Sequence, residues 1–131
     1  MAGSERTVFD TNTILGFLRK YPGYPDLKLM YPASDLFISE ITEIELLSYW
    51  DIAPEEESSI KCLLSDVVII PLTPEIKQET IRFRKSAKCK TPDSIIAATA
   101  ILLNATLITH DVKLSKVVFP QFKAVTPSAE Q

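Results

Sequence analysis

The chain of 131 residues has the length of one domain, and its apolar fraction of 46% and charged fraction of 24% are those of an ordinary globular protein. Fourteen basic against seventeen acidic side chains give a formal net charge of −3, which excludes a global positive field that would attract nucleic acid. The single histidine excludes a multi-histidine metal site, the two cysteines match no metal-binding spacing, and no apolar run could cross a bilayer, so we expect a cytoplasmic protein without membrane contact.

The first half of the chain alternates between short apolar runs and helical patterns. The expected elements are a strand over Thr7–Phe9, a helix over about Thr13–Lys20, a strand over Leu36–Ile38, a helix over about Glu40–Trp50 and a helix over Pro54–Leu64. Ser39 fits an N-cap, and Pro54 stands where proline is tolerated at a helix start. Residues 26–34 contain a hint of one helical turn and stay unassigned.

The second half continues the alternation. The expected elements are a β-branched strand over Val67–Ile70, a helix from Thr73 to about Ser86, a helix over Ser94–Leu103, a strand over Thr106–Thr109, a short helix after Asp111 and an edge strand over Phe122–Val125. The third strand is apolar on both faces, which is typical of the interior of a parallel sheet. The helix over Ser94–Leu103 is almost entirely apolar and is therefore expected in the centre of the domain.

Strands that alternate with helices throughout predict a parallel α/β sheet with right-handed crossovers in one domain over residues 1–131, with a core of about 6–125. In such sheets, binding sites lie outside the carboxyl ends of the strands. Asp10 and Asp111 both lie just past the carboxyl end of a predicted strand, and Asp93 opens the central helix. The fold class therefore gives these acids a reason to converge.

Each candidate acid also has a purely structural explanation. Asp10 and Asp111 could cap the helices that follow them. Asp93 could simply be an acid that the helix dipole favours in the first turn of its helix. Glu45 follows Thr42 at the spacing of a capping box.

Glu43 competes with Glu45 for any site near this helix. The two side chains are separated by about 160° at roughly 100° per residue, so only one of them can face a given site. Glu45 shares its side of the helix with Ser48 and Tyr49, whereas Glu43 lies among apolar residues. Periodicity alone leaves open which side faces the sheet edge.

Taken together, the acids indicate a metal site. Carboxylates gathered at one edge repel one another, and some should take up protons unless a cation neutralises them. Oxygen ligands without a histidine or cysteine partner suit Mg²⁺ or Mn²⁺. Such ions lower the pKa of a bound water and stabilise charge on a scissile phosphate, so the acids predict hydrolysis of phosphodiester bonds.

Four motifs of the chain resemble those of PIN domains, in particular the VapC-type toxins of bacterial and archaeal toxin–antitoxin pairs. The motifs are Val8-Phe9-Asp10-Thr11-Asn12, Ser39-x-Ile41-Thr42-x-x-Glu45-Leu46, Lys90-Thr91-Pro92-Asp93-Ser94-Ile95-Ile96-Ala97-Ala98-Thr99-Ala100 and Leu107-Ile108-Thr109-His110-Asp111. Together they span nearly the whole chain in this order.

The resemblance implies a single PIN-like nuclease domain with three layers, whose five-stranded parallel sheet has the order 3-2-1-4-5. It also implies a metal-dependent endoribonuclease, the toxin of a VapBC-type pair. Such toxins are homodimers, and a VapB-type antitoxin inhibits them by placing its tail in the active-site groove.

The resemblance further implies the residues of the site. It carries over Asp10, Glu45, Asp93 and Asp111 as the catalytic acids that bind Mg²⁺ or Mn²⁺, and it selects Glu45 over its competitor. Asn12 and Thr109 match polar positions that orient the acids or their waters.

A basic run leads into the third motif and contains no acid. Its members are Arg82, Arg84, Lys85, Lys88 and Lys90. We expect this run to contact the RNA backbone. The alternative is a solvated helix end, where the helix dipole favours cations.

Two other interpretations stay open. A catalytically silent PIN-like domain that binds RNA or regulates a partner would have kept the fold, although the presence of all four acids argues against it. A phosphatase or receiver-like domain with an aspartate nucleophile is a weaker option, because the sequence Asp10-Thr11-Asn12 lacks a second aspartate two residues on.

Overall fold

The computed structural model describes residues 6–24, 26, 35–49 and 51–127 of the chain. Its five strands are β1 (Arg6–Phe9), β2 (Asp35–Ser39), β3 (Val68–Ile70), β4 (Thr106–Ile108) and β5 (Lys123–Val125), and all neighbouring pairs are parallel in the order β3-β2-β1-β4-β5. The helices are α1 (Thr11–Leu18), α3 (Glu40–Leu47), α4 (Pro54–Leu64), α5 (Pro74–Ala87), α6 (Thr91–Leu103) and α7 (Val112–Ser115). The predicted fold class and strand order are confirmed. In this part of the chain, no helix is both long and apolar enough to cross a membrane.

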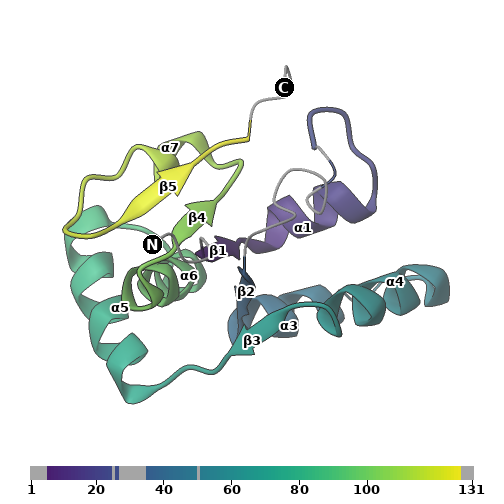
Figure 1. Cartoon of the computed structure of the whole chain (residues 1–131), viewed down its shortest axis with the longest axis horizontal. Coiled ribbons are helices and arrows are strands. Elements are labelled where there is room, and N and C mark those ends of the chain that lie inside the picture. The colour runs from purple at the N-terminus through teal and green to yellow at the C-terminus, as the bar shows by residue number, and fades with distance from the viewer. Residues whose placement is uncertain (1–5, 25, 27–34, 50, 128–131) are drawn as a thin grey trace.

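Helices cover both faces of the sheet. Successive strand residues point to opposite faces, and the apolar residues of β1 are buried on both. Val8 of β1 packs with Phe83 of α5 and Ile96 of α6, whereas the next residue, Phe9, packs with Ile14 of α1 on the other face. Figure 1 shows α5 and α6 on one side of the strands and α1, α3 and α4 on the other. The domain therefore has three layers, and β1 lies at its centre.

Helix α6 is the central helix that the sequence predicts, with eight consecutive buried residues from Ser94 to Ile101. Its buried Ser94 and Thr99 hydroxyls donate to backbone carbonyls one turn earlier, at 2.9 and 2.8 Å, so burial leaves them satisfied. The helix begins at Thr91, three residues earlier than predicted, and its N-cap is Lys90. Asp93 consequently lies in the first turn of a helix whose body is fixed in the core.

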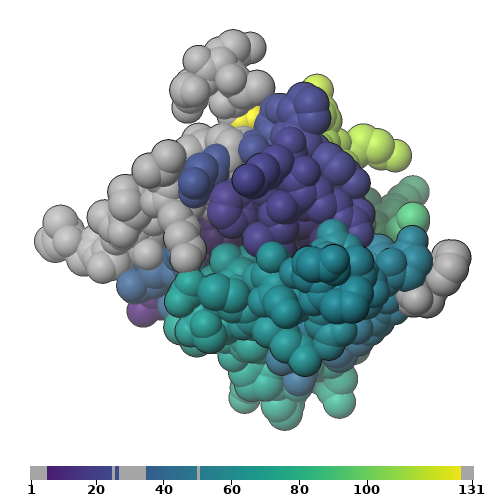
Figure 2. Space-filling view, turned by 90° about the vertical axis from the view of Figure 1, so that its right-hand side faces the viewer, coloured from purple at the N-terminus to yellow at the C-terminus, as the bar shows by residue number. Residues whose placement is uncertain are grey.

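An ion pair joins the end of α1 to α4. Arg19 donates to both carboxylate oxygens of Glu56, from Nε at 2.5 Å and from Nη2 at 3.0 Å. The Arg19 guanidinium also lies 5.5 Å from the centre of the Tyr49 ring, just beyond α3. In Figure 2, α1 (purple) lies directly against α4 (teal) on the face that the view presents.

Two other helix boundaries and the position of one strand differ from the predictions. Helix α1 begins at Thr11 rather than Thr13, because the Asp10 carboxylate caps it by accepting from Thr13 N. Helix α3 ends at Leu47, short of the predicted end at residue 50, which lies outside the described residues, as do residues 27–34. The apolar third strand is an edge strand rather than an interior one, and Val68 is 51% exposed.

Candidate active site

Asp10 lies at the carboxyl end of β1, and hydrogen bonds hold both of its carboxylate oxygens. Oδ1 accepts from Thr13 N at 2.9 Å, and Oδ2 accepts from the Thr109 hydroxyl. Only 7% of the residue is exposed. The cap explanation and the site explanation are therefore compatible, because the helix start fixes the direction in which this carboxylate points.

Glu45 is anchored from the neighbouring helix. Its Oε1 accepts from the Thr11 hydroxyl at 2.5 Å, and the Thr11 and Thr42 hydroxyls are hydrogen-bonded to each other at 3.2 Å. The capping-box explanation of Glu45 is wrong, because Ser39 caps α3 by accepting from Ile41 N at 3.1 Å. The three residues Thr11, Thr42 and Glu45 thus tie α1 to α3 at the sheet edge.

Asp93 is the acid that its surroundings perturb most clearly. It is partly buried, and no hydrogen bond within the described part of the chain engages its carboxylate. Burial raises the pKa of Asp93, and the negative charges of Asp111, Asp10 and Glu45 raise it further, in that order. The other three acids therefore lie near enough to Asp93 to act on it electrostatically.

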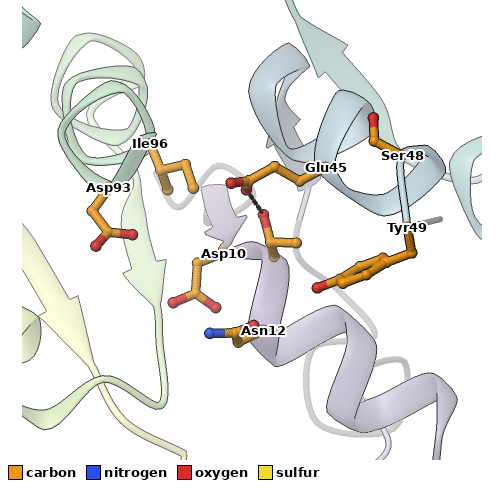
Figure 3. Close-up of a pocket in the computed structure, with 8 residues that line it drawn as sticks. Asp10, Asn12, Glu45, Ser48, Tyr49, Asp93 and Ile96 are labelled. Atoms are coloured by element: carbon orange, nitrogen blue, oxygen red, sulfur yellow. Dashed lines mark hydrogen bonds between the residues drawn. The ribbon is translucent and has the colours of Figure 1, made fainter. Parts of the chain in front are cut away.

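Asp10, Glu45 and Asp93 line one pocket of about 400 Å³, which we call the acidic pocket. Figure 3 shows them facing a common opening from the start of α1, from α3 and from α6. The other lining residues are Thr11, Asn12, Ser48, Tyr49 and Ile96. No lysine or arginine is among these lining residues, so their three carboxylates have no basic neighbour in the pocket wall.

Asp111 lies in an adjacent pocket. Its Oδ1 accepts from Leu114 N at 3.1 Å and so caps α7, and its backbone N–H donates to the Thr109 hydroxyl at 3.0 Å. The adjacent pocket and the acidic pocket share Asp93. The structure thus brings three of the four predicted acids into one pocket and places the fourth beyond Asp93.

The two predicted supporting residues occupy different layers of the site. Asn12 is exposed and lines the acidic pocket, whereas Thr109 is fully buried and connects Asp10 to the backbone of Asp111. Thr11, which directly follows Asp10 within the first motif, was not among the predicted site residues. Glu43 is not among the residues that line the acidic pocket.

Tyr49 was predicted to share the side of Glu45, and its place in the pocket wall agrees with the helical periodicity. Burial raises the pKa of the Tyr49 phenol, against the positive charge of Arg19, which lowers it. The phenol is therefore a neutral hydrogen-bonding group at neutral pH, and it adds no charge to the pocket.

The donor set fits a hard divalent cation in its chemistry. Carboxylate oxygens without histidine or cysteine are the ligands that Mg²⁺ and Mn²⁺ prefer, and burial together with the neighbouring negative charges already raises the pKa of Asp93. Within the described ranges, no three Asp, Glu, His or Cys side chains lie close enough together to hold one ion. Binding would therefore require the acidic side chains to draw together.

The basic run is divided by the structure. Arg82 forms an ion pair with Glu79 on the same helix at 2.8 Å, and Arg84 and Lys85 are exposed in the last turn of α5. Lys88 and Lys90 instead line the pocket that contains Asp111. The helix-end explanation therefore fits the first part of the run, and the last two lysines lie beside the acids.

An α/β domain with an acidic pocket at the carboxyl edge of a parallel sheet defines a broad class of proteins. The family model for the PIN domain matches residues 7–120, and the chain therefore belongs to the PIN-domain family. This confirms the family predicted from the four sequence motifs. No curated protein sequence matches the chain.

Solved structures resemble the chain over almost its whole length. A toxin–antitoxin complex from Klebsiella pneumoniae contains a chain 29% identical, with 92% of this chain and 97% of that chain covered and a TM-score of 0.73. VapBC2 from Rickettsia felis, bound to a DNA fragment from its promoter, gives 24% identity, coverage of 92% and 98% and a TM-score of 0.77. VapBC-1 from nontypeable Haemophilus influenzae gives 24% identity, coverage of 96% and 99% and a TM-score of 0.72. These similarities agree with the VapC-type motifs of the sequence.

Proposed function

We propose that this chain is a metal-dependent endoribonuclease, the toxin of a VapBC-type pair, which hydrolyses phosphodiester bonds of RNA. The observation that carries the proposal is the acidic pocket, because three carboxylates from separate elements line it and no lysine or arginine is among its lining residues. Such a concentration of negative charge is costly unless a cation binds, and fold stability does not explain the presence of all four acids. RNA in the cell would be the substrate, so we place the protein in the cytoplasm.

In this proposal Asp10, Asp93 and Asp111 hold Mg²⁺ or Mn²⁺, and Glu45 completes the site or positions a water. The ion, when bound, supplies the positive charge that lowers the pKa of a water and stabilises the charge on the scissile phosphate. The protein keeps Asp10 in one orientation through Thr13 N and the Thr109 hydroxyl. These contacts fix the ligand before the ion arrives, as supporting hydrogen bonds do in metal sites generally.

The test is cleavage of cellular RNA by the purified protein, with chelator or Mn²⁺, followed by sequencing of the RNA ends. Asp10→Asn and Asp93→Asn should each abolish metal-dependent cleavage. An amide at position 10 can still accept from Thr13 N, so we expect the fold to persist. Asp35→Asn is the matched control, because Asp35 is exposed at the opposite end of its strand, and it should cleave normally.

Two results would contradict the assignment. Cleavage at the rate of the unmodified protein by both Asp10→Asn and Asp93→Asn would remove these residues from the reaction. A protein that binds RNA but shows neither Mn²⁺ binding by calorimetry nor metal-dependent turnover would be the catalytically silent PIN-like domain instead.

The proposed partners are a VapB-type antitoxin and a second copy of the chain. The solved structures above are toxin–antitoxin or VapBC complexes, which supports an antitoxin partner. For the homodimer, the supporting observation is exposed apolar surface on α3 and beside it. Ile44 of α3 and Leu72 are both exposed, and Leu72 is held near this helix because its N–H donates to Glu40 at 2.6 Å, one helical turn before Ile44. Light scattering of the chain with and without its antitoxin tests both partners.

A further inference from the structure

A second pocket lies next to the acidic pocket and is lined by three lysines. Lys88 and Lys90 come from the connection between α5 and α6, and Lys113 comes from α7. The pocket has about 330 Å³, and its wall also contains Asp93 and Asp111. We call it the lysine pocket; neither the sequence motifs nor the proposed hydrolysis accounts for Lys113.

The two pockets have opposite charge. The acidic pocket has three carboxylates in its wall, whereas the lysine pocket sets three ammonium groups against two carboxylates. A phosphate would therefore be repelled by the first pocket in the absence of a cation, and attracted by the second. Because Asp93 belongs to both walls, the two pockets are adjacent on the surface.

The backbone places the lysines relative to the acids. Helix α5 ends at Ala87, and its C-cap, Lys88, has a left-handed conformation with φ of 58°. The chain turns there toward Lys90, the N-cap of α6. Asp93 follows in the first turn of that helix. Lys113 likewise lies in the short helix that Asp111 caps. Each lysine is thus attached to an element that also positions an acid.

The lysines also form no ion pair within the described residues. The side chains of Lys88, Lys90 and Lys113 are all exposed. Arg82, by contrast, is paired with Glu79. The ammonium groups of the lysine pocket are therefore available to an anion that enters it.

We propose that the lysine pocket binds a backbone phosphate of the RNA adjacent to the scissile one, and that it does so without a metal ion. The inference rests on the proposed ribonuclease function and adds an order of events to it. The lysines hold the strand through one phosphate, and the neighbouring phosphate enters the acidic pocket when a cation is present. Lys113 becomes a substrate-binding residue in addition to Lys88 and Lys90.

The test compares two double variants of equal charge. Lys88→Gln/Lys113→Gln removes two lysines of the pocket, and Lys77→Gln/Lys116→Gln removes two exposed lysines outside it. Binding of a fluorescent single-stranded RNA is measured by anisotropy in chelator, over a series of salt concentrations. The pocket variant should bind about tenfold more weakly at low salt, and its slope of log K against log salt should fall by roughly 0.7 for each phosphate that the removed lysines neutralise in the unmodified protein.

The control variant should bind as the unmodified protein does, and equal circular dichroism melting curves would show that both variants fold. With Mn²⁺, the pocket variant should show a raised KM and a smaller change in kcat. Equal affinity of the two double variants for RNA in chelator would overturn the inference. So would lysine-dependent binding of an acidic peptide in place of RNA.

Failure of this inference and failure of the proposed function give different results. Lysine-dependent RNA binding without metal-dependent cleavage would leave the lysine pocket standing and end the ribonuclease proposal. Metal-dependent cleavage with an unchanged KM in the Lys88→Gln/Lys113→Gln variant would support the ribonuclease proposal and contradict RNA binding by the lysine pocket.

Discussion

Replacement of Asp93 by asparagine should stabilise the metal-free protein at neutral pH. The pKa of Asp93 is raised above its ordinary value of 3.8, first by burial and then by the charges of Asp111, Asp10 and Glu45. The ionised carboxylate is therefore less favourable in the folded state than in the unfolded chain. Asp93→Asn removes that charge and keeps the shape, and because solvent screens this partly exposed carboxylate we expect a gain of at most about 1 kcal/mol. In a domain of 131 residues this is a rise in Tm of at most roughly 3–5 °C.

The pH dependence of the gain follows from the direction of the shift. With a raised pKa, the folded state retains the proton at pH values where the unfolded chain has released it, so stability falls as the pH rises through this window. Well below pH 3.8 the carboxylic acid is neutral in both states, and Asp93→Asn should change Tm little. The difference should grow as the pH rises above that value and level off once the folded-state group has ionised.

Manganese should reverse the order of stability. An ion that binds only the folded protein at a hundredfold excess over its Kd contributes about 2.7 kcal/mol, which exceeds the gain from removal of the repulsion. In thermal unfolding, Asp93→Asn should therefore have a higher Tm than the unmodified protein in chelator, and a lower Tm than the unmodified protein in saturating Mn²⁺. Asp35→Asn is the control that should not change either order. A lower Tm for Asp93→Asn in chelator at pH 7.5 would refute the repulsion argument, and unchanged order in Mn²⁺ would refute its place in the metal site.

Two further substitutions test the contacts around the site. Thr109→Val removes the hydroxyl that donates to Asp10, so we expect a loss of about 1–3 kcal/mol in urea unfolding and, by calorimetry, roughly 10–100-fold weaker Mn²⁺ binding. Arg19→Ala removes the partner of Glu56 and should cost about 1 kcal/mol at pH 7. The hydrogen bond from Arg19 lowers the pKa of Glu56 below 4.5, so this stabilisation is present above that pH and should disappear as the pH falls through the folded-state pKa in a series of thermal melts.

The fold was predictable because its strongest signals are local and periodic. Eight consecutive buried residues of α6 appear in the sequence as an almost entirely apolar run between Pro92 and Asn104, and Ser39 is an N-cap in both the prediction and the structure. The edge position of β3 was not predictable from its own residues. A β-branched run fits an interior strand and an edge strand equally, and only the order of pairing decides between them.

The division of the acids between two pockets was not predictable either. Asp10, Asp93 and Asp111 each stand at a helix start, which the sequence shows, but the direction of a carboxylate depends on its hydrogen-bond donors. Thr109 donates to Asp10 and accepts from the backbone of Asp111, so one buried hydroxyl positions two acids. The bond to Asp10 joins positions 99 residues apart, and no local pattern in the sequence specifies it.

The net charge of −3 weighed against a nucleic-acid partner in the sequence analysis, and the structure explains why it is a weak argument. Net charge averages over the surface, whereas a charged polymer responds to the local field within about one Debye length, ~10 Å in dilute salt. Here three of the four acids line one pocket, and three lysines line the next. A divalent cation in the acidic pocket would offset two of its three carboxylate charges, and would so weaken the repulsion of a phosphate where the pockets meet at Asp93. The same negative total is therefore compatible with a surface that binds phosphates.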